Sequence, residues 1–176
     1  VGKSSLFNRL LGRREAIVLD RPGVTRDRLE RVCRLSRRSV LLQDTGGLVP
    51  EADDELLRQV SRQALLAIEQ ADVAVLVVDG RAGVTPLDRS VADILRPAGI
   101  PVVLAVNKID TERLEAEAAD AWSLGLGEPW PVSAEHGLGV EALAEAVERE
   151  LPPAASDVPD ELPADQRPDP AVELHV

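Results

Sequence analysis

Hydrophobic residues in this chain gather in short runs that polar and helical stretches separate. Apolar runs at 71–78 and 100–106, with a shorter one at 40–42, are typical of strands buried on both faces of a parallel sheet. Alternating apolar and polar positions at 29–35 predict a half-buried edge strand. A short last strand is predicted at 131–133. The pattern therefore indicates a sheet whose central strands are fully buried.

Apolar positions at helical spacing lie between these strands. They predict helices at 4–11, 52–70, 86–97, 111–122 and 139–151. Strands that alternate with helices imply an α/β fold, with a mostly parallel sheet covered by helices on both faces. Such sheets bind ligands beyond the carboxyl ends of their strands, and the polar motifs of this chain follow those ends.

The composition changes after residue 151. Residues 152–172 are dense in proline and acidic side chains, which predicts an extended linker. Residues 173–176 have the pattern of a strand that is just beginning. We therefore expect one domain at 1–151, a linker at 152–172 and the start of a second domain at 173–176. In the alternative, residues 173–176 fold back to fill a missing first strand of the first domain.

Charge is unevenly distributed along the chain. The net charge is −11, which argues against a surface that binds a nucleic-acid backbone throughout. Residues 1–40 are nevertheless arginine-rich and basic, and they either face RNA or form a solvated strand and turn; the sequence leaves both open. The chain has no apolar run of 18 residues, so we expect no membrane span. The single Cys33 fits a reducing compartment.

The chain begins with residues typical of the second half of a phosphate-binding loop. Gly2-Lys3-Ser4 matches the end of G-x-x-x-x-G-K-[ST], in which backbone N–H groups cradle nucleotide phosphates. Lys3 would reach the β- and γ-phosphates, the Ser4 hydroxyl would ligate Mg²⁺, and Ser5 follows in the same turn. The leading strand and the first half of the loop are missing, so we expect part of the phosphate cradle to be missing too.

Two further segments carry groups suited to a metal and a γ-phosphate. Asp44, after the strand at 40–42, would support Mg²⁺, and the Gly47 N–H would approach the γ-phosphate; the alternative is an ordinary Asp-Gly turn. Thr25, in a long loop that contains Pro22-Gly23, would ligate Mg²⁺ and sense the γ-phosphate. The predicted metal ligands are therefore Ser4, Thr25 and Asp44.

The strand at 100–106 ends in the sequence NKID at 107–110. Asp110 would accept two hydrogen bonds from the adjacent N1 and N2 donors of guanine, which adenine does not offer. The stem of Lys108 would lie along the base, and Asn107 would tie this loop to the phosphate loop. The spacing after a buried strand makes this the most specific motif in the chain.

Ser133-Ala134 closes the last predicted strand. The backbone N–H of Ala134 would meet guanine O6. A plain loop that leads into the next helix is the alternative, and only the other motifs favour a role in base recognition.

Taken in order, these motifs resemble the five motifs of translation-factor-type GTPases. Three segments resemble the first G domain of the Der (EngA) family, bacterial GTPases with two tandem G domains. They are DRPGVTRDR at 20–28, DTGG at 44–47 and SAEHGLG at 133–139. The resemblance covers roughly residues 1–151. It implies a P-loop GTPase domain that binds GTP and GDP with Mg²⁺, followed by a second G domain. It further implies a cytoplasmic monomer that acts with ribosomal RNA in assembling the large ribosomal subunit.

The sequence departs from Ras-like enzymes at Leu48, where they place a glutamine that orients the attacking water. Der-like proteins share this feature, and the resemblance implies a potassium-assisted route that uses an asparagine in the missing part of the loop. K⁺ is therefore a further expected cofactor, and no catalytic base is assigned. Two functions stay open: a slow GTPase switch, or a nucleotide-gated module that binds RNA or protein with little hydrolysis of its own.

Overall fold

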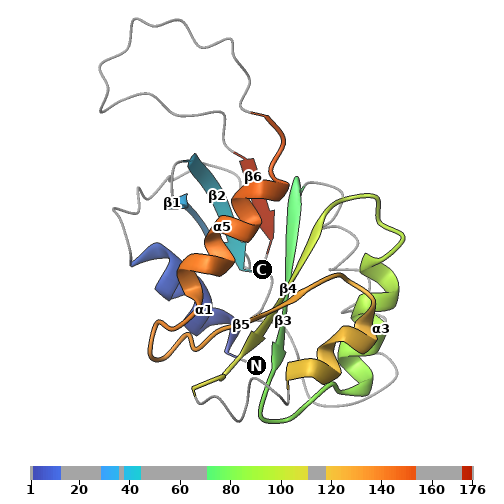
Figure 1. Ribbon diagram of the computed structural model, residues 1–176. Coiled ribbons are helices and arrows are strands. Elements are labelled where there is room, and N and C mark those ends of the chain that lie inside the picture. Colours follow the sequence, from blue (N-terminus) through green and yellow to red (C-terminus); the bar gives the residue numbers. More distant parts are fainter. Residues whose placement is uncertain are drawn as a thin grey trace, which may run out of the picture.

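The computed structural model describes residues 2–12, 29–35, 38–44, 71–110, 118–153 and 172–175, with the backbone alone at 29–30, 34 and 172–175. Its elements in chain order are α1 (Lys3–Leu11), β1 (Leu29–Leu35), β2 (Arg38–Asp44), β3 (Val73–Asp79), α3 (Pro86–Leu95), β4 (Val102–Asn107), the 3₁₀ helix η1 (Ala118–Leu124), β5 (Pro129–Pro131), α5 (Val140–Glu150) and β6 (Val172–His175) (Figure 1). The helix predicted at 52–70 lies outside the described residues.

The strands form one sheet in the order β1-β2-β6-β3-β4-β5. β1 pairs antiparallel with β2, whereas every other neighbouring pair is parallel. The prediction of a mostly parallel sheet is therefore confirmed, as is the place of β1 at an edge. β2 starts two residues earlier than its apolar run because Arg38 pairs with Leu35 of β1.

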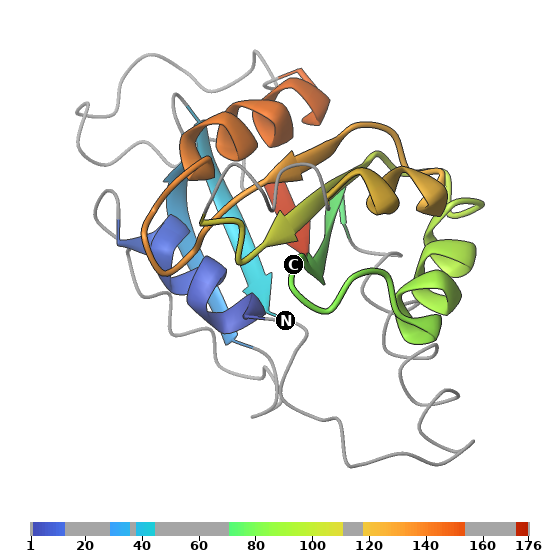
Figure 2. The same cartoon turned by 60° about the horizontal axis from the view of Figure 1, so that its bottom comes forward.

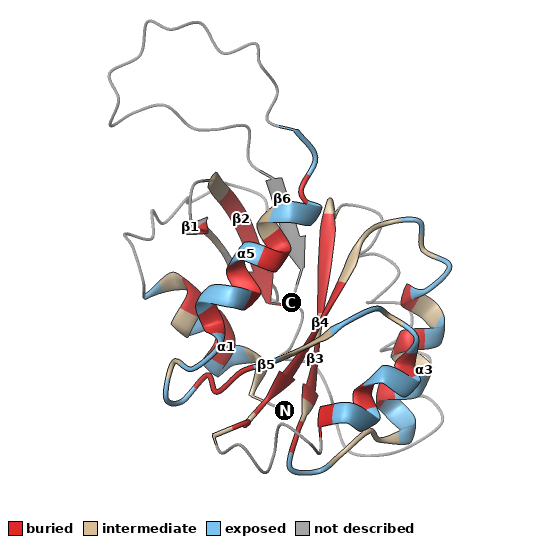
Figure 3. Ribbon diagram, in the orientation of Figure 1, coloured by how far each residue is buried: buried red, intermediate tan, exposed pale blue. Residues whose placement is uncertain are grey.

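Alternate side chains of the central strands pack against different helices. Val73, Val75 and Val77 of β3 join the core under α1 and α5, whereas Val78, with Leu104 of β4, packs against η1 and α3. Successive side chains of a strand point to opposite faces, so one apolar run supplies both cores. Figure 3 shows buried residues along the strands and on the helix faces that cover them. The expectation of helices on both faces is confirmed.

Two predicted elements differ in detail. Of the helix predicted at 111–122, the structure describes only the end, which is the 3₁₀ helix η1; Ala118, Ala121 and Leu124 are buried at a spacing of three, which suits three residues per turn. The last strand was predicted at 131–133, but β5 is Pro129–Pro131. Ser133 leaves the ladder because it forms a bridge with Leu138 instead. Prolines are tolerated in β5 because it is an edge strand.

β6 lies between β2 and β3, in the middle of the sheet (Figure 1). Val172 to His175 pair with Val40 to Gln43 of β2, and Leu174 pairs with Val73 of β3. This is the alternative in which the segment folds back into the first domain. Backbone groups of β2 and β3 that face each other would otherwise lie unpaired in the centre of the sheet.

Replacing residues 172–176 with a Gly-Ser segment of equal length should lower the free energy of unfolding by roughly 2 kcal/mol or more, because ordered pairing in the sheet centre is weakened. Urea unfolding followed by circular dichroism measures the change. A Gly-Ser replacement of the same length at 160–164, in the predicted linker, is the control. Unchanged stability would mean that β6 does not pair in this sheet, and it would favour assigning these residues to a second domain.

Candidate nucleotide-binding site

The predicted site residues that the structure describes gather at one edge of the sheet. Asp44 ends β2 and Asn107 ends β4, and these strands run in the same direction. α1 begins at this edge: Figure 2, which brings it forward, shows the N-terminus beside the ends of the strands. The loop after β5 completes the edge. Thr25 and Gly47 lie outside the described residues.

α1 begins after Gly2, whose backbone is left-handed with a φ of 82°. A Cβ atom at this position would lie 2.5 Å from Asn107 Nδ2, which is too close for non-bonded atoms. The Gly2 carbonyl accepts a hydrogen bond from the Leu6 N–H at 3.0 Å, so the first turn of the helix starts here. Glycine is required both for this backbone conformation and for the close approach of Asn107.

The side chain of Asn107 joins the start of α1 to the loop after β5. It is 2% exposed. Its Oδ1 accepts a hydrogen bond from the Ala134 N–H at 2.9 Å, and its Nδ2 donates a long one of 3.5 Å to the Gly2 carbonyl. This is the contact with the start of α1 that the sequence led us to expect. One buried amide thus fixes the distance between two separate parts of the site.

Ser4 and Asp44 place two oxygen atoms side by side at the start of α1. Ser4 Oγ donates to Asp44 Oδ2 at 3.1 Å, and Asp44 is 3% exposed. A hydroxyl and a carboxylate fit Mg²⁺, which prefers oxygen ligands. The structure therefore brings together two of the three predicted metal ligands, Thr25 being the third.

The ammonium group of Lys3 lies near the same carboxylate. Burial lowers the pKa of Lys3 below its ordinary value, and the charge of Asp44 opposes this without cancelling it. An anion bound beside Lys3 would favour the charged form again. The first N–H groups of any α-helix lack partners within the helix, so the turn at Lys3, Ser4 and Ser5 is suited to phosphate oxygens.

Two ion pairs connect the ends of β3 and β4. Lys108 Nζ pairs with Asp79 Oδ2, and Arg81 Nη2 pairs with Asp110 Oδ2 at 2.6 Å. Burial raises the pKa of Asp79, but hydrogen bonds from Lys108 and from the backbone N–H groups of Arg81 and Ala82 outweigh it, so that the pKa lies below its ordinary value. Asp79 therefore stays charged at neutral pH and holds the Lys108 side chain at this edge.

Lys108 has a φ of 70°, the one positive φ at a residue other than glycine in the described part of the chain. A side chain in this region costs roughly 1–2 kcal/mol. Hydrogen bonds on both sides hold it: the Gly80 N–H donates to the Asn107 carbonyl at 2.8 Å, and the Ile109 N–H donates to the Val132 carbonyl at 2.9 Å. Strain of this kind is often found where a loop presents side chains to a ligand.

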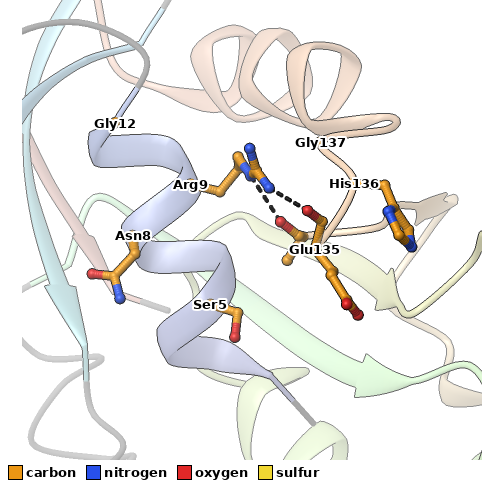
Figure 4. Close-up of a pocket in the computed structure, with 8 residues that line it drawn as sticks. Ser5, Asn8, Arg9, Gly12, Glu135, His136 and Gly137 are labelled. Atoms are coloured by element: carbon orange, nitrogen blue, oxygen red, sulfur yellow. Dashed lines mark hydrogen bonds between the residues drawn. The ribbon is translucent and has the colours of Figure 1, made fainter.

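The loop after β5 is a tight turn that α1 contacts from the side (Figure 4). The Gly137 N–H donates to the Ser133 carbonyl at 2.7 Å and closes the turn. Arg9 of α1 donates from Nε to the Ala134 carbonyl at 2.8 Å and from Nη2 to the Glu135 carbonyl. Ser133 and Ala134 are 2% and 3% exposed, so the loop is held firmly against the domain.

The sequence does not single out three residues that the structure brings to this edge, Asp79, Arg81 and Arg9. Asp79 ends a buried strand just as Asp44 does, and this position in the sequence could have marked it as a candidate site residue. Arg9 offered none, because its partner lies 125 residues further along the chain.

Solved structures with the same fold are P-loop GTPase domains. The chain is similar to a mutant of S. thermophilus NFeoB bound to mGDP, with a TM-score of 0.57 and 26% identity over 85% of this chain and 57% of that one. It also matches apo SelB, a translation elongation factor from Methanococcus maripaludis, with a TM-score of 0.56 and 21% identity over 84% of this chain and 31% of that one. The second likeness concerns the fold alone. The chain is therefore a P-loop GTPase domain in fold and motif order.

Residues 1–108 match the family described as 50S ribosome-binding GTPase, and the chain belongs to that family. It is 51% identical to GTPase Der of Geobacter metallireducens over 92% of this chain, and 49% identical to GTPase Der of Myxococcus xanthus over 94%. The matches cover 37% and 36% of those two proteins, so the chain spans about a third of their length. The resemblance to the Der family is thereby confirmed.

No helix among the residues that the structure describes has the length and apolar character needed to cross a membrane. None of their His, Cys, Asp and Glu side chains form a group of three or more that would hold a metal ion.

Replacing Gly2 with Ala should destabilise the chain more than replacing Gly83 with Ala. Both glycines are left-handed, with φ of 82° and 69°, but a Cβ at Gly83 meets nothing within 4 Å. The Gly83→Ala variant therefore reports the backbone cost alone, about 1–2 kcal/mol, and the Gly2→Ala variant adds the clash with Asn107. Urea unfolding of the two variants measures the difference. Equal losses would mean that Asn107 does not approach the Gly2 backbone closely.

Proposed function

We propose that this chain binds GTP and GDP with Mg²⁺ and hydrolyses GTP slowly, as a switch in assembly of the large ribosomal subunit. The observation that carries the proposal is the Asn107 side chain, which links the helix start suited to phosphates with the loop suited to a base. Membership of the 50S ribosome-binding GTPase family and the likeness to GTPase Der support it.

At the phosphate end, Lys3 and the N–H groups of the first turn would bind the β- and γ-phosphates. Ser4 and Asp44 would hold Mg²⁺, which neutralises phosphate charge when bound. The predicted partners Thr25 and Gly47 would complete this end, Thr25 at the metal and Gly47 at the γ-phosphate. The lowered pKa of the half-buried Lys3 supports an anionic ligand, because an anion replaces the hydration that the ammonium has lost.

At the base end, Asp110 would accept hydrogen bonds from N1 and N2 of guanine. Its Oδ2 already pairs with Arg81, but a carboxylate has about four acceptor sites, so both bonds can form beside the ion pair. Asp79 holds Lys108 where its stem would lie along the base. The Ala134 N–H donates to Asn107, so guanine O6 would share this donor with Asn107 Oδ1 or replace it.

No catalytic base is proposed, because hydrolysis in this class depends on positioning and electrostatic stabilisation. Leu48 cannot orient the attacking water as glutamine does. We therefore propose that the intrinsic rate is slow and depends on a monovalent cation such as K⁺, or on the ribosome.

The relatives support a proposal about the wider context of the domain. We propose that residues 1–151 are the first of two tandem G domains and that the linker at 152–172 leads towards the second, whose predicted start at 173–176 competes with the pairing of β6 in the first domain. The protein would act in the cytoplasm as a monomer on the large ribosomal subunit and its RNA. The position of β6 favours the alternative for its own four residues, and the replacement experiment above separates the two.

A second candidate function is a nucleotide-gated module that binds RNA or protein with little hydrolysis. Position 48 carries leucine instead of a glutamine that could orient water, and this favours weak GTP turnover. The basic segment at 1–40 would then supply the docking surface.

Replacing Asp110 with Asn should move nucleotide preference from guanine to xanthine, because an amide can donate to the C2 carbonyl of xanthine where the carboxylate accepted from N2. We expect GTP affinity to fall at least about a hundredfold and xanthosine triphosphate to bind in its place. Xanthosine triphosphate then reports this site even if a second G domain is present. Isothermal titration measures binding, and phosphate release measures turnover.

Asp93→Asn is the matched control, because Asp93 pairs with Arg96 on the surface away from the site. Binding and turnover that both move to xanthine support the GTPase. Movement of binding without any turnover supports the nucleotide-gated module. If neither moves, Asp110 does not read the base.

GTP turnover of the full-length protein should be several-fold faster in potassium than in sodium at equal ionic strength, with Mg²⁺ present and ribosomes absent. Phosphate release at matched salt concentrations tests this. Equal turnover in the two salts would contradict the potassium-assisted route.

A further inference from the structure

α1 contacts both ends of the proposed site. Its first turn carries Lys3 and Ser4, and Arg9 lies six residues after Lys3, about 9 Å along the helix axis at 1.5 Å per residue. Arg9 donates hydrogen bonds to the carbonyls of Ala134 and Glu135. One helix thus connects the phosphate end directly with the loop at the base end.

The bonds from Arg9 hold the loop in a defined orientation. Its Nε–H donates to Ala134 O at 2.8 Å, and its Nη2 donates to the next carbonyl. The guanidinium group lies over Gly137, where an added Cβ would be 3.7 Å from Nη1. A planar group with two parallel donors fixes two successive peptide planes, which a single donor would not.

Ala134 is therefore held from both sides. Asn107 Oδ1 accepts from its N–H at 2.9 Å, and Arg9 donates to its carbonyl. Asn107 also contacts Gly2 at the start of α1, so the hydrogen bonds form a closed circuit from Gly2 through Asn107 and Ala134 back to Arg9 on the same helix. Neither backbone group of Ala134 can turn without breaking a bond of this circuit.

The same residues border an open cleft of about 490 Å³ between α1 and the loop, lined by Ser5, Asn8 and His136 among others. Figure 4 shows Arg9 reaching from the helix to the loop beside this cleft. Arg9 therefore reaches the loop beside an open cleft, and its hydrogen bonds add to the burial of Ala134 in the core in setting the position of the loop.

We propose that Arg9 is a positioning residue for guanine recognition: by holding the Ala134 carbonyl it keeps this residue where its N–H, which donates to Asn107 Oδ1, can also be reached by O6 of the base. The inference rests on the proposed function. This positioning role differs from a general structural role in one respect: the loss of Arg9 should weaken the contact between the protein and guanine O6.

Replacing Arg9 with Ala should weaken GDP binding roughly tenfold, since two charge-assisted hydrogen bonds to the loop are lost. Three probes locate the loss: GDP, 6-thio-GDP, which carries a poor acceptor at position 6, and IDP, which keeps O6 but lacks the amino group read by Asp110. We expect the tenfold loss for GDP and IDP and little further loss for 6-thio-GDP. Isothermal titration of the full chain with Mg²⁺ present measures all three.

Arg96→Ala is the matched control, because Arg96 also donates to a backbone carbonyl, that of Leu124 at 2.8 Å, away from the site. It should leave all three affinities unchanged. Arg9→Lys, with a single donor group, should restore only part of the GDP affinity.

The outcomes separate the inference from the function on which it rests. A wild-type chain that binds GDP, with an Arg9→Ala variant that binds all three probes as tightly, overturns the positioning role alone. An equal loss on all three probes also overturns it, because Arg9 would then act on the fold or on the phosphates. A wild-type chain that binds none of the probes overturns the proposed function, and the inference with it.

Discussion

The described part of the site depends on one buried amide, the side chain of Asn107. A primary amide that is 2% exposed must find partners for its polar atoms, and here it takes them from two distant segments, the carbonyl of Gly2 and the N–H of Ala134. A strand end, a helix start and a loop are thereby fixed relative to one another. The Asn107 amide approaches the Gly2 backbone so closely that a side chain at position 2 would collide with it, which explains the glycine there.

The sheet provides the second constraint, because the two ends of the site stand on different strands. Asp44 ends β2 and Asn107 ends β4, with β6 and β3 between them in the sheet. Neighbouring strands lie about 4.8 Å apart, so the pairing of these four strands sets the distance between the groups proposed to bind the metal and the base. The ion pairs of Asp79 and Asp110 then hold the loops that leave β3 and β4.

Hydrophobic periodicity was enough to predict most of the described fold. It located β1, β3, β4, α1 and α5 within about two residues, because burial on one or both faces leaves a clear pattern. It misplaced β5, where two prolines hide the strand and the Ser133–Leu138 bridge ends it early. Asp44 and Asn107 were predicted to follow strand ends, and they are the last residues of β2 and β4. The contact of Arg9 with Ala134 could not be predicted, because a long side chain that meets a backbone carbonyl far along the chain leaves no local pattern.

A switch must interact differently with its two ligands, since a group that binds both equally shifts no equilibrium. In the site as proposed, Asp110, Lys108 and Ala134 meet only the base, which GTP and GDP share. Asn107 and Arg9 hold these groups in place, and so they also act equally on both nucleotides. Any difference between the two states must therefore arise at the γ-phosphate, where Lys3 and the predicted partners Thr25 and Gly47 would act. The circuit from Gly2 to Arg9 would then be the fixed part of the proposed site, which holds the nucleotide while those groups respond to its last phosphate.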